Sequence, residues 1–295
     1  MKIAFILNPR IGTKRAKNLL MLAEKRFKES DIRFDLFVTQ YNGHAAEIIK
    51  NMSLAEYDGI VSVGGDGTNY HVLNGLLKYH HDTKLPPLGI IPAGRGNSFA
   101  KDLDIYTEED GFAALSRRKT RAVDVCRFTQ DKDFYFFVNL MGLGFVTDVA
   151  KTAACFGWTG DLSYIIGVLY RTMRLKFHHL DIKIDGHKIS GKNCFVEICN
   201  SRFTGGNMLM APGAKIDDGL FDVVVLSSIS RTNLISTFPK IFKGTHGDNS
   251  AVTFYQGKTA WIRTTPEKAL LPDGEIFGAA PTQITILPGR VRYFS

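Results

Sequence analysis

Short apolar runs alternate with amphipathic stretches along the first 124 residues of the chain. The runs that read as strands are 3–7, 33–39, 59–63 and 88–91. Between them, Lys14–Glu29 places its apolar residues at helical spacing, and 44–51 and 69–79 show the same period. Repeated strand–helix units predict an α/β domain with a doubly wound parallel sheet covered by helices on both faces.

The pattern changes after Asp124, where short β-branched or aromatic segments dominate. These segments are Phe134–Asn139, Asp181–Ile184, Asn193–Asn200, Leu220–Leu226, Ala260–Thr264 and Gln283–Leu287. Helical spacing is sparse and is found chiefly in 162–177 and 231–242. We therefore expect two domains: residues 1–124, and a 125–295 antiparallel β-sandwich whose last residues are candidates to return to the first domain.

The composition indicates a globular protein but does not identify its binding partner. The 295 residues are 44% hydrophobic and 22% charged, which is ordinary globular composition. The net charge of +8 suits nucleotide phosphates, an anionic bilayer surface or nucleic acid, and simple solubility explains it equally well. The four cysteines form no CxxC pair, and no apolar stretch approaches the roughly 20 residues of a membrane span. We expect a cytoplasmic protein with peripheral membrane contact.

The segment Gly64-Gly65-Asp66-Gly67-Thr68 joins a predicted strand to a predicted helix. Glycines let backbone N–H groups approach a phosphate closely, and the helix N-terminus favours negative charge. The segment matches neither the dinucleotide fingerprint nor the P-loop. Asp66 suits a role in handling magnesium or orienting a phosphate, and the alternative is a tight turn with a capping carboxylate.

A second glycine loop follows the fourth predicted strand, with the sequence Pro92-Ala-Gly94-Arg95-Gly96-Asn97. Ligands bind where the carboxyl ends of neighbouring parallel strands meet, so both loops are expected to line one nucleotide site. Arg95 there either clamps a phosphate or points into solvent. Asn97 either caps the next helix or reaches the ligand.

In their order along the chain, these motifs resemble the diacylglycerol kinase catalytic-domain family, which includes bacterial lipid kinases and the sphingosine and ceramide kinases. The matching segments are Asn8-Pro9…Gly12, Thr39…Gly43-His44-Ala45, 64–68, Gly89…Ala100, Asn139…Gly142…Gly144-Phe145, Leu162-Ser163-Tyr164, Gly205…Leu220 and Asp273-Gly274-Glu275. The resemblance implies an NAD kinase-like N-terminal domain followed by a β-sandwich that handles the lipid.

The resemblance also implies roles for individual residues. ATP-contacting positions correspond to Asn8, Pro9, Arg10, Gly12, Thr39, Gly64, Gly65, Asp66, Gly67, Thr68, Asn69, His71, Gly94, Arg95 and Asn97. A structural Mg²⁺ in some bacterial members corresponds to Lys215, Asp218 and Leu220. The proton acceptor corresponds to Asp273, with Glu275 beside it; an aspartate can take the proton of a lipid hydroxyl as phosphorus is attacked. On sequence alone, Asp273-Gly274 also reads as a β-turn.

Two positions depart from the family pattern, and one segment is a candidate for lipid contact. Arg95 stands where the family usually has Thr or Ser, and His71 stands where it has an acid.

Leu162–His179 combines apolar residues with three basic ones and no acid, which suits an interfacial or substrate-channel helix as well as a core helix with a solvated basic face. We interpret Arg117–Arg121 as a solvated loop.

The sequence therefore predicts an ATP- and Mg²⁺-dependent lipid kinase that phosphorylates a hydroxyl of diacylglycerol, phosphatidylglycerol or a long-chain base. Asp66, Asp273 and Glu275 are the catalytic candidates. The alternatives are an NAD kinase-like enzyme and a catalytically silent sensor of lipid or nucleotide. The expected partners are a lipid substrate and an anionic membrane surface rather than nucleic acid, and a homodimer is left open.

Overall fold

The computed structural model describes residues 1–80, 83–155 and 162–295, with the side chains of 162–164 also outside the description. The chain divides into two compact units. Unit 1 comprises Met1–Val123 and Gly289–Ser295, and unit 2 comprises Asp124–Pro288. The Leu162-Ser163-Tyr164 motif lies outside the described side chains.

Unit 1 is built on a parallel sheet in the order β4–β3–β1–β2. Its strands are β1 (Lys2–Leu7), β2 (Arg33–Val38), β3 (Gly59–Gly64) and β4 (Leu88–Pro92). The last strand of the chain, β17 (Thr282–Phe294), joins this sheet beside β4, where Tyr293 lies opposite Leu88. β3 and β4 are buried along their whole length, which explains their continuous apolar runs.

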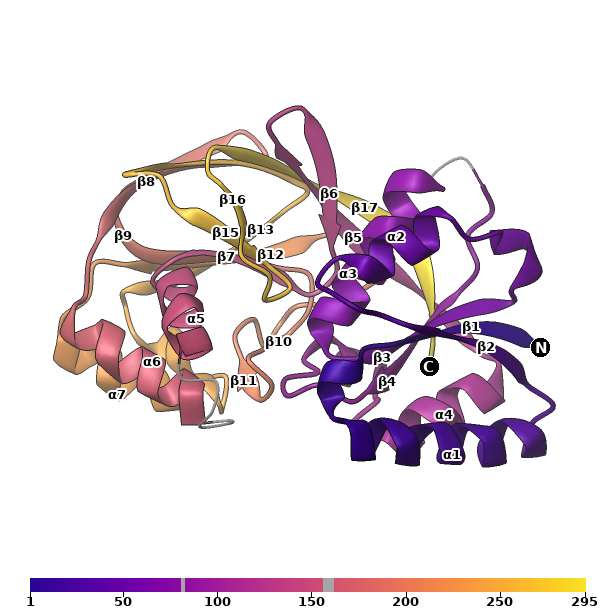
Figure 1. Ribbon diagram of the computed structural model, residues 1–295. Coiled ribbons are helices and arrows are strands. Elements are labelled where there is room, and N and C mark those ends of the chain that lie inside the picture. Colours follow the sequence, from indigo (N-terminus) through magenta and orange to yellow (C-terminus); the bar gives the residue numbers. More distant parts are fainter. Residues whose placement is uncertain (81–82, 156–161) are drawn as a thin grey trace. The chain divides into compact units, whose positions relative to one another are not determined.

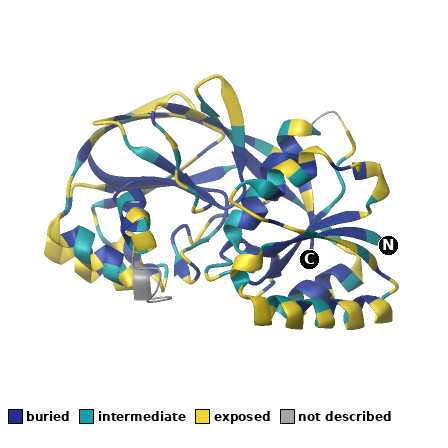
Figure 2. Ribbon diagram, viewed as in Figure 1, coloured by how far each residue is buried: buried dark blue, intermediate teal, exposed yellow. Residues whose placement is uncertain are grey.

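Helices cover both faces of this sheet (Figure 1). They are α1 (Thr13–Glu29) and α4 (Glu108–Arg117) on one face, and α2 (His44–Lys50) and α3 (Asp66–Tyr79) on the other. α1 buries Leu19, Ala23 and Phe27 at a spacing of four, and its outer side is exposed (Figure 2). The described residues of the unit also form short 3₁₀ helices: η1 (Pro9–Ile11), η2 (Leu54–Glu56) and η3 (Phe99–Leu103).

Unit 2 is built from antiparallel strand pairs. Its strands are β5 (Thr120–Gln130), β6 (Asp133–Phe137), β7 (Leu140–Gly144), β8 (His178–Ile184), β9 (His187–Cys199), β10 (Phe203–Thr204), β11 (Met208–Leu209), β12 (Phe221–Ser227), β13 (Val252–Gly257), β14 (Thr259–Thr265), β15 (Ala269–Pro272), β16 (Phe277–Ala279) and most of β17. The predicted fold class, a parallel α/β unit followed by antiparallel strands, is confirmed.

The strands of unit 2 separate two apolar cores. Along β12, Val223 and Val225 enter the first core, while Val224 and Leu226 enter the second, because successive side chains of a strand point to opposite faces. The second core is closed by α5 (Phe145–Cys155), α6 (Leu162–Met173) and α7 (Arg231–Ile241), followed by the 3₁₀ helix η5 (His246–Asp248). These three helices lie together on one side of the unit 2 strands (Figure 1).

The structure differs from the sequence prediction at several elements. α5 was not predicted, because four of its first five residues, Phe145, Val146, Thr147 and Val149, are β-branched or aromatic and follow a strand directly. The predicted strand 134–139 ends at Phe137, and β7 begins at Leu140. Each helix in the described part of the chain is too short or too polar to cross a membrane.

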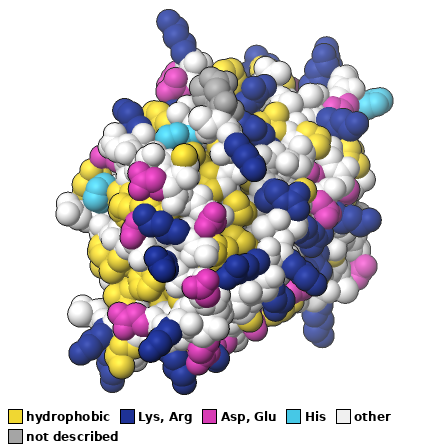
Figure 3. Space-filling view, turned by 90° about the vertical axis from the view of Figure 1, so that its right-hand side faces the viewer, with side chains coloured by type: hydrophobic (Ala, Val, Ile, Leu, Met, Phe, Trp, Pro, Cys, Tyr) yellow, Lys and Arg dark blue, Asp and Glu magenta, His cyan; other side chains and the backbone are white. Residues whose placement is uncertain are grey.

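Charged side chains are spread widely over the surface of the protein. Lys and Arg occur across the face shown in Figure 3, with Asp and Glu between many of them. Such a mixed surface keeps a protein soluble without requiring a charged partner. The net charge of +8 is therefore less informative than the local sites described next.

Candidate functional site

The two glycine loops of unit 1 pack against each other through their backbones. The amides of Ala93 and Gly94 donate hydrogen bonds to the carbonyl of Gly64 at 2.8 and 2.9 Å. A Cβ atom on Gly94 would overlap Gly65, lying 2.8 Å from its nitrogen. Gly94 is therefore required for the loops to meet this closely, while a Cβ on Gly65 would lie 3.2 Å from the Cα of Gly94.

The carboxylate of Asp66 joins the first loop to the second. Its Oδ2 accepts the amide of Ser98 at 3.0 Å, and its Oδ1 accepts the amide of Phe99 at 3.2 Å. Removal from water raises the pKa of Asp66, while these two amides and the charge of Lys101 oppose that shift. The predicted role in handling magnesium or orienting a phosphate stays a prediction. The structure shows that this side chain fixes the path of residues 98–99.

Two asparagines hold the loops in place. Asn8 donates from Nδ2 to Thr68 Oγ1 at 3.1 Å and accepts the amide of Arg10 at 3.0 Å. Asn97 has a left-handed backbone with φ of 50°, and its amide group bonds both the N–H and the carbonyl of Gly94, each at 2.9 Å. Asn97 thus closes its own loop, whereas the sequence favoured a helix cap or a ligand contact.

Asn69 is bound from the far end of the chain. It is 3% exposed, and its Oδ1 accepts the hydroxyl of Tyr293 at 3.1 Å. Tyr293 is fully buried, and its ring also packs against Phe99 at a centroid distance of 5.1 Å. Tyr293 could not be predicted from the sequence, because it lies 224 residues from its partner. The buried side chain of Asn69 therefore supports the loop at 64–68 from the interior of unit 1.

The remaining predicted nucleotide residues differ in their surroundings. Thr39 is 7% exposed, and its amide bonds the carbonyl of Leu7. His71 donates from Nε2 to Asn42 Oδ1 at 2.9 Å. Arg95 is exposed, and the described residues offer it no hydrogen-bond partner, so its guanidinium is available to a ligand.

The outer turn of the site lies between β1 and α1. Pro9 and Arg10 are exposed there, and Gly12 has a left-handed φ of 99°, which permits the sharp entry into α1. Arg15, which the sequence did not indicate, donates to the carbonyl of Ala93 at 2.9 Å and so braces the second loop. Unit 1 thus brings residues 8–12, 64–69 and 93–97 together at the carboxyl edge of its sheet.

Asp273 in unit 2 is held by three backbone amides. Its Oδ1 accepts from Asn139 at 2.9 Å and from Leu140 at 3.2 Å, and its Oδ2 accepts from Val138 at 3.2 Å. The side chain is 3% exposed, and its backbone is left-handed with φ of 48°. Asp273 therefore fixes the start of β7. Glu275, two residues on, is half-buried, and its amide bonds the carbonyl of Pro272.

A buried polar cluster surrounds this carboxylate. Asn200 donates from Nδ2 to the carbonyls of Asp124 and Val138 at 3.0 and 2.8 Å, and Ser201 bonds the side chain of Asn139. Asn200 and Ser201 are fully buried. Of this cluster, the sequence motif indicated only Asn139. Asn200 and Ser201 come from a distant segment and belong to no recognisable local motif.

The predicted metal residues form an exposed turn before β12. Asp218 Oδ1 accepts the amide of Leu220 at 3.0 Å, and the amide of Gly219 bonds the buried carboxylate of Asp124 at 2.6 Å. No group of three or more His, Cys, Asp and Glu side chains suited to a metal occurs among the described residues. The carbonyls of Lys215 and Leu220 with the Asp218 carboxylate would offer oxygen ligands, which Mg²⁺ prefers, and the metal site here stays a prediction.

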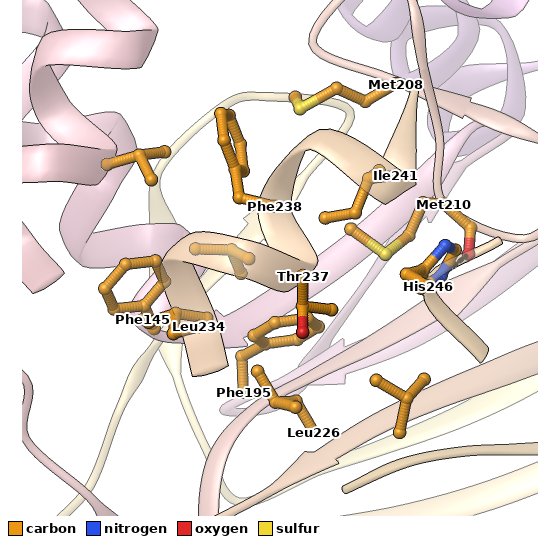
Figure 4. A pocket seen from close by; sticks show the side chains of 13 residues that line it. Phe145, Phe195, Met208, Met210, Leu226, Leu234, Thr237, Phe238, Ile241 and His246 are labelled. Carbon is orange, nitrogen blue, oxygen red and sulfur yellow. Dashed lines mark hydrogen bonds between the residues drawn. The ribbon is translucent and has the colours of Figure 1, made fainter. Parts of the chain in front are cut away.

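The helices of unit 2 enclose an apolar pocket over the second core (Figure 4). The pocket is partly open to solvent. Its lining residues are Phe145, Val146, Val168, Phe195, Met208, Met210, Leu226, Leu234, Thr237, Phe238, Ile241, His246 and Val252. Of these described residues, only Thr237 and His246 carry side-chain oxygen or nitrogen, so the pocket suits a hydrocarbon chain.

A buried acid lies on the same face of β9 as the pocket residue Phe195. Glu197 is 2% exposed, and it stands between Gly142 on β7 and Val224 on β12. Its Oε2 has no hydrogen-bond partner in the described part of the protein. Burial raises the pKa of Glu197 to about 8, so the side chain is mostly neutral at pH 7.

Comparisons with known proteins agree with this arrangement. The diacylglycerol kinase catalytic domain matches residues 2–128, and the YegS C-terminal NAD kinase beta sandwich-like domain matches residues 140–295. A crystal structure described as a candidate diacylglycerol kinase of Bacillus anthracis str. Sterne superposes with a TM-score of 0.83 at 24% identity, covering 99% of this chain and 96% of that one.

Relatives of this chain include both diacylglycerol and sphingosine kinases. Diacylglycerol kinase of Mycobacterium tuberculosis H37Rv is 30% identical over 240 residues, covering 80% of this chain and 76% of the relative. Diacylglycerol kinase of Bacillus subtilis 168 is 26% identical and covers 96% and 92%. Sphingosine kinase 1 of Arabidopsis thaliana is 27% identical, covering 87% of this chain, which spans only 63% of that protein's length.

A parallel α/β unit with paired glycine loops, followed by an antiparallel unit with an apolar pocket, matches the two domains of this protein class. The chain belongs to the diacylglycerol kinase family, with the catalytic domain and the YegS-type C-terminal domain in the family order. The resemblance drawn from the motifs is confirmed.

Proposed function

We propose that this protein transfers the γ-phosphate of ATP to a hydroxyl of a lipid, with diacylglycerol, phosphatidylglycerol or a long-chain base as acceptor. The N-terminus of α3 supports nucleotide binding, because a helix N-terminus favours a negatively charged phosphate, and the two glycine loops meet directly before it. Arg95 adds an available positive charge at the second loop. Mg²⁺, when bound, would neutralise phosphate charge.

The proposal that the acceptor is a lipid rests on the position of β7. The amide of Leu140, the first residue of β7, is bound by Asp273, and Phe145, which follows the last residue of the strand, lines the apolar pocket. Five residues of strand span about 16 Å. A lipid of ordinary chain length can therefore reach from the pocket to the acidic turn at 273–275.

We propose that one carboxylate of this turn accepts the proton of the attacking hydroxyl. Asp273 is the family-type candidate, and its buried, amide-bound position gives it a fixed geometry. Glu275 is more accessible and is the second candidate. Either would act as a general base while the glycine loops hold the phosphates.

The decisive experiment offers the purified protein γ-labelled ATP with a panel of lipid hydroxyls and, separately, NAD. We expect a labelled lipid identified by mass spectrometry and no labelled NAD. Phosphorylation of NAD alone would support the NAD kinase-like alternative. ATP or lipid binding without any transfer would support the sensor alternative.

We further propose a cytoplasmic protein that contacts an anionic membrane through α6 and α7. Positions 162–179 and 228–247 contain six Lys and Arg and no Asp or Glu. On α6, Leu169 and Met173 are 49% and 67% exposed, and on α7 Ile235 is 49% exposed. Apolar side chains beside basic ones favour the headgroup region of a bilayer, where the lipid substrate would be taken up.

A further inference from the structure

One residue that lines the pocket of unit 2 carries a nitrogen with no hydrogen-bond partner among the described residues. His246 lines the pocket and is 1% exposed. Its Nε2 lies 3.0 Å from the carbonyl oxygen of Met210, and Figure 4 shows the two residues side by side. Its Nδ1 is buried and has no hydrogen-bond partner in the part of the chain that the structure describes.

The contact with Met210 determines the tautomer of His246. A carbonyl oxygen only accepts hydrogen bonds, so Nε2 must carry the hydrogen. In the neutral ring, Nδ1 is then a bare acceptor. Burial lowers the pKa of His246, which keeps the ring neutral at physiological pH and leaves Nδ1 without a hydrogen.

The orientation of the His246 ring is fixed on two sides. The Met210 carbonyl holds Nε2, and the ring of Phe254 packs at a centroid distance of 5.4 Å with an interplanar angle of 58°. The other polar lining residue, Thr237, is already engaged, because its Oγ1 accepts from Asn249 Nδ2 at 2.7 Å. His246 is therefore the lining residue with an unmet acceptor.

We propose that His246 selects acceptor lipids whose chain carries a hydrogen-bond donor, a hydroxyl or an amide N–H, at the depth of this residue. A plain hydrocarbon chain fills the pocket but leaves Nδ1 unpaired, and an unpaired buried acceptor is costly. A donor-bearing chain pairs it, and sites built around such a bond discriminate strongly against analogues that lack it. This inference rests on the proposed lipid kinase function and names the substrate class.

The binding arm of the test does not depend on catalysis. Stearate and a series of monohydroxystearates, with the hydroxyl moved along the chain, are compared by native mass spectrometry for binding to the full-length protein. We expect one hydroxyl position to bind roughly 10–100-fold more tightly than stearate. His246→Phe should abolish that preference while stearate binding persists, which also shows that the pocket is still formed. Thr237→Val is the matched control and should keep the preference.

The turnover arm uses pairs of acceptor lipids that differ only in one chain hydroxyl, or in an amide replacing an ester. We expect kcat/KM to favour the donor-bearing member in the wild type and to favour neither in His246→Phe; the two pairs show which donor is used. Equal binding of all chains by the wild type, or an unchanged preference in His246→Phe, would overturn the inference. A binding preference without turnover of any lipid would instead refute the proposed kinase function and leave the selection by His246 standing.

Discussion

The backbone of Gly94 lies against the backbone of Gly65, with no room between them for a methyl group. This contact joins the loop after β3 to the loop after β4 and holds the two loops at a short, fixed separation. Gly94→Ala should therefore weaken ATP binding by about 100-fold or more, since one loop must move away. Isothermal titration with ATP measures the change.

A matched control for this variant is available in unit 2. Gly191 on β9 has no atom within 4 Å of an added Cβ. Gly191→Ala should bind ATP as the wild type does. ATP affinity of Gly94→Ala within twofold of the wild type would contradict the role of the close approach.

The hydroxyl of Tyr293 supports the first loop through Asn69, and both side chains are buried. Tyr293→Phe leaves the Asn69 oxygen without this donor, so we expect a loss of about 1–2 kcal/mol in the free energy of unfolding. Chemical denaturation measures it. Tyr106→Phe, at a position that is 59% exposed, is the control and should change stability by less than about 0.5 kcal/mol.

Substitutions at Asp273 and at Glu275 should differ in their effects on turnover and on stability. Asp273→Asn should abolish phosphate transfer while ATP affinity stays within a few-fold, because the nucleotide loops belong to unit 1. It should also lower stability by about 1–3 kcal/mol, since the amide nitrogen cannot accept from the backbone N–H groups that bind the carboxylate.

Glu275→Gln should leave stability unchanged because Glu275 is only half-buried. Single-turnover assays and thermal melts of both variants decide between the two bases. Retained turnover in Asp273→Asn with loss in Glu275→Gln would assign proton transfer to Glu275.

Glu197 makes the stability of the protein depend on pH. Burial raises the pKa of Glu197 from an ordinary value of 4.5 to about 8, so the native state keeps a proton that the unfolded state releases. Its contribution to stability is therefore full below pH 4.5 and falls as pH rises toward 8, by about 1.4 kcal/mol per pH unit at most.

Glu197→Gln should remove this slope, and the exposed control Glu24→Gln should keep it. Denaturation midpoints between pH 5 and pH 8 provide the measurement. The same slope in Glu197→Gln as in the wild type would mean that another group controls the dependence.

Membrane contact through α7 should depend on its basic residues. Lys240 and Lys243 are exposed beside the exposed Phe242. A basic residue near an anionic surface contributes about 1 kcal/mol, so Lys240→Gln with Lys243→Gln should weaken binding to phosphatidylserine-containing vesicles roughly 10–30-fold. Vesicle sedimentation measures it, with Lys25→Gln and Lys28→Gln on α1 as the charge-matched control. An equal loss of vesicle binding in the two double variants would indicate non-specific electrostatic attraction.

The sequence predicted those parts of the site whose chemistry is local. Residues 64–68 and 92–97 are contiguous, and each follows a strand, so their glycines could be interpreted directly. Asp124 and Tyr293 escaped prediction because their partners Gly219 and Asn69 are 95 and 224 residues away. The role of Asn97 was also missed, since nothing in the sequence shows that its amide would bind Gly94.

The strand β17 makes unit 1 discontinuous: residues 289–295 enter its sheet only after the whole of unit 2 has been synthesised. At roughly 5–20 residues per second, the ribosome needs on the order of 10 s or more to make that intervening stretch. During this time, β4 is paired with β3 but lacks β17 on its other side, and Asn69 lacks the hydroxyl of Tyr293. A nascent chain should therefore complete unit 2 before its nucleotide loops acquire their final support, which delays tight ATP binding until translation reaches the last strand.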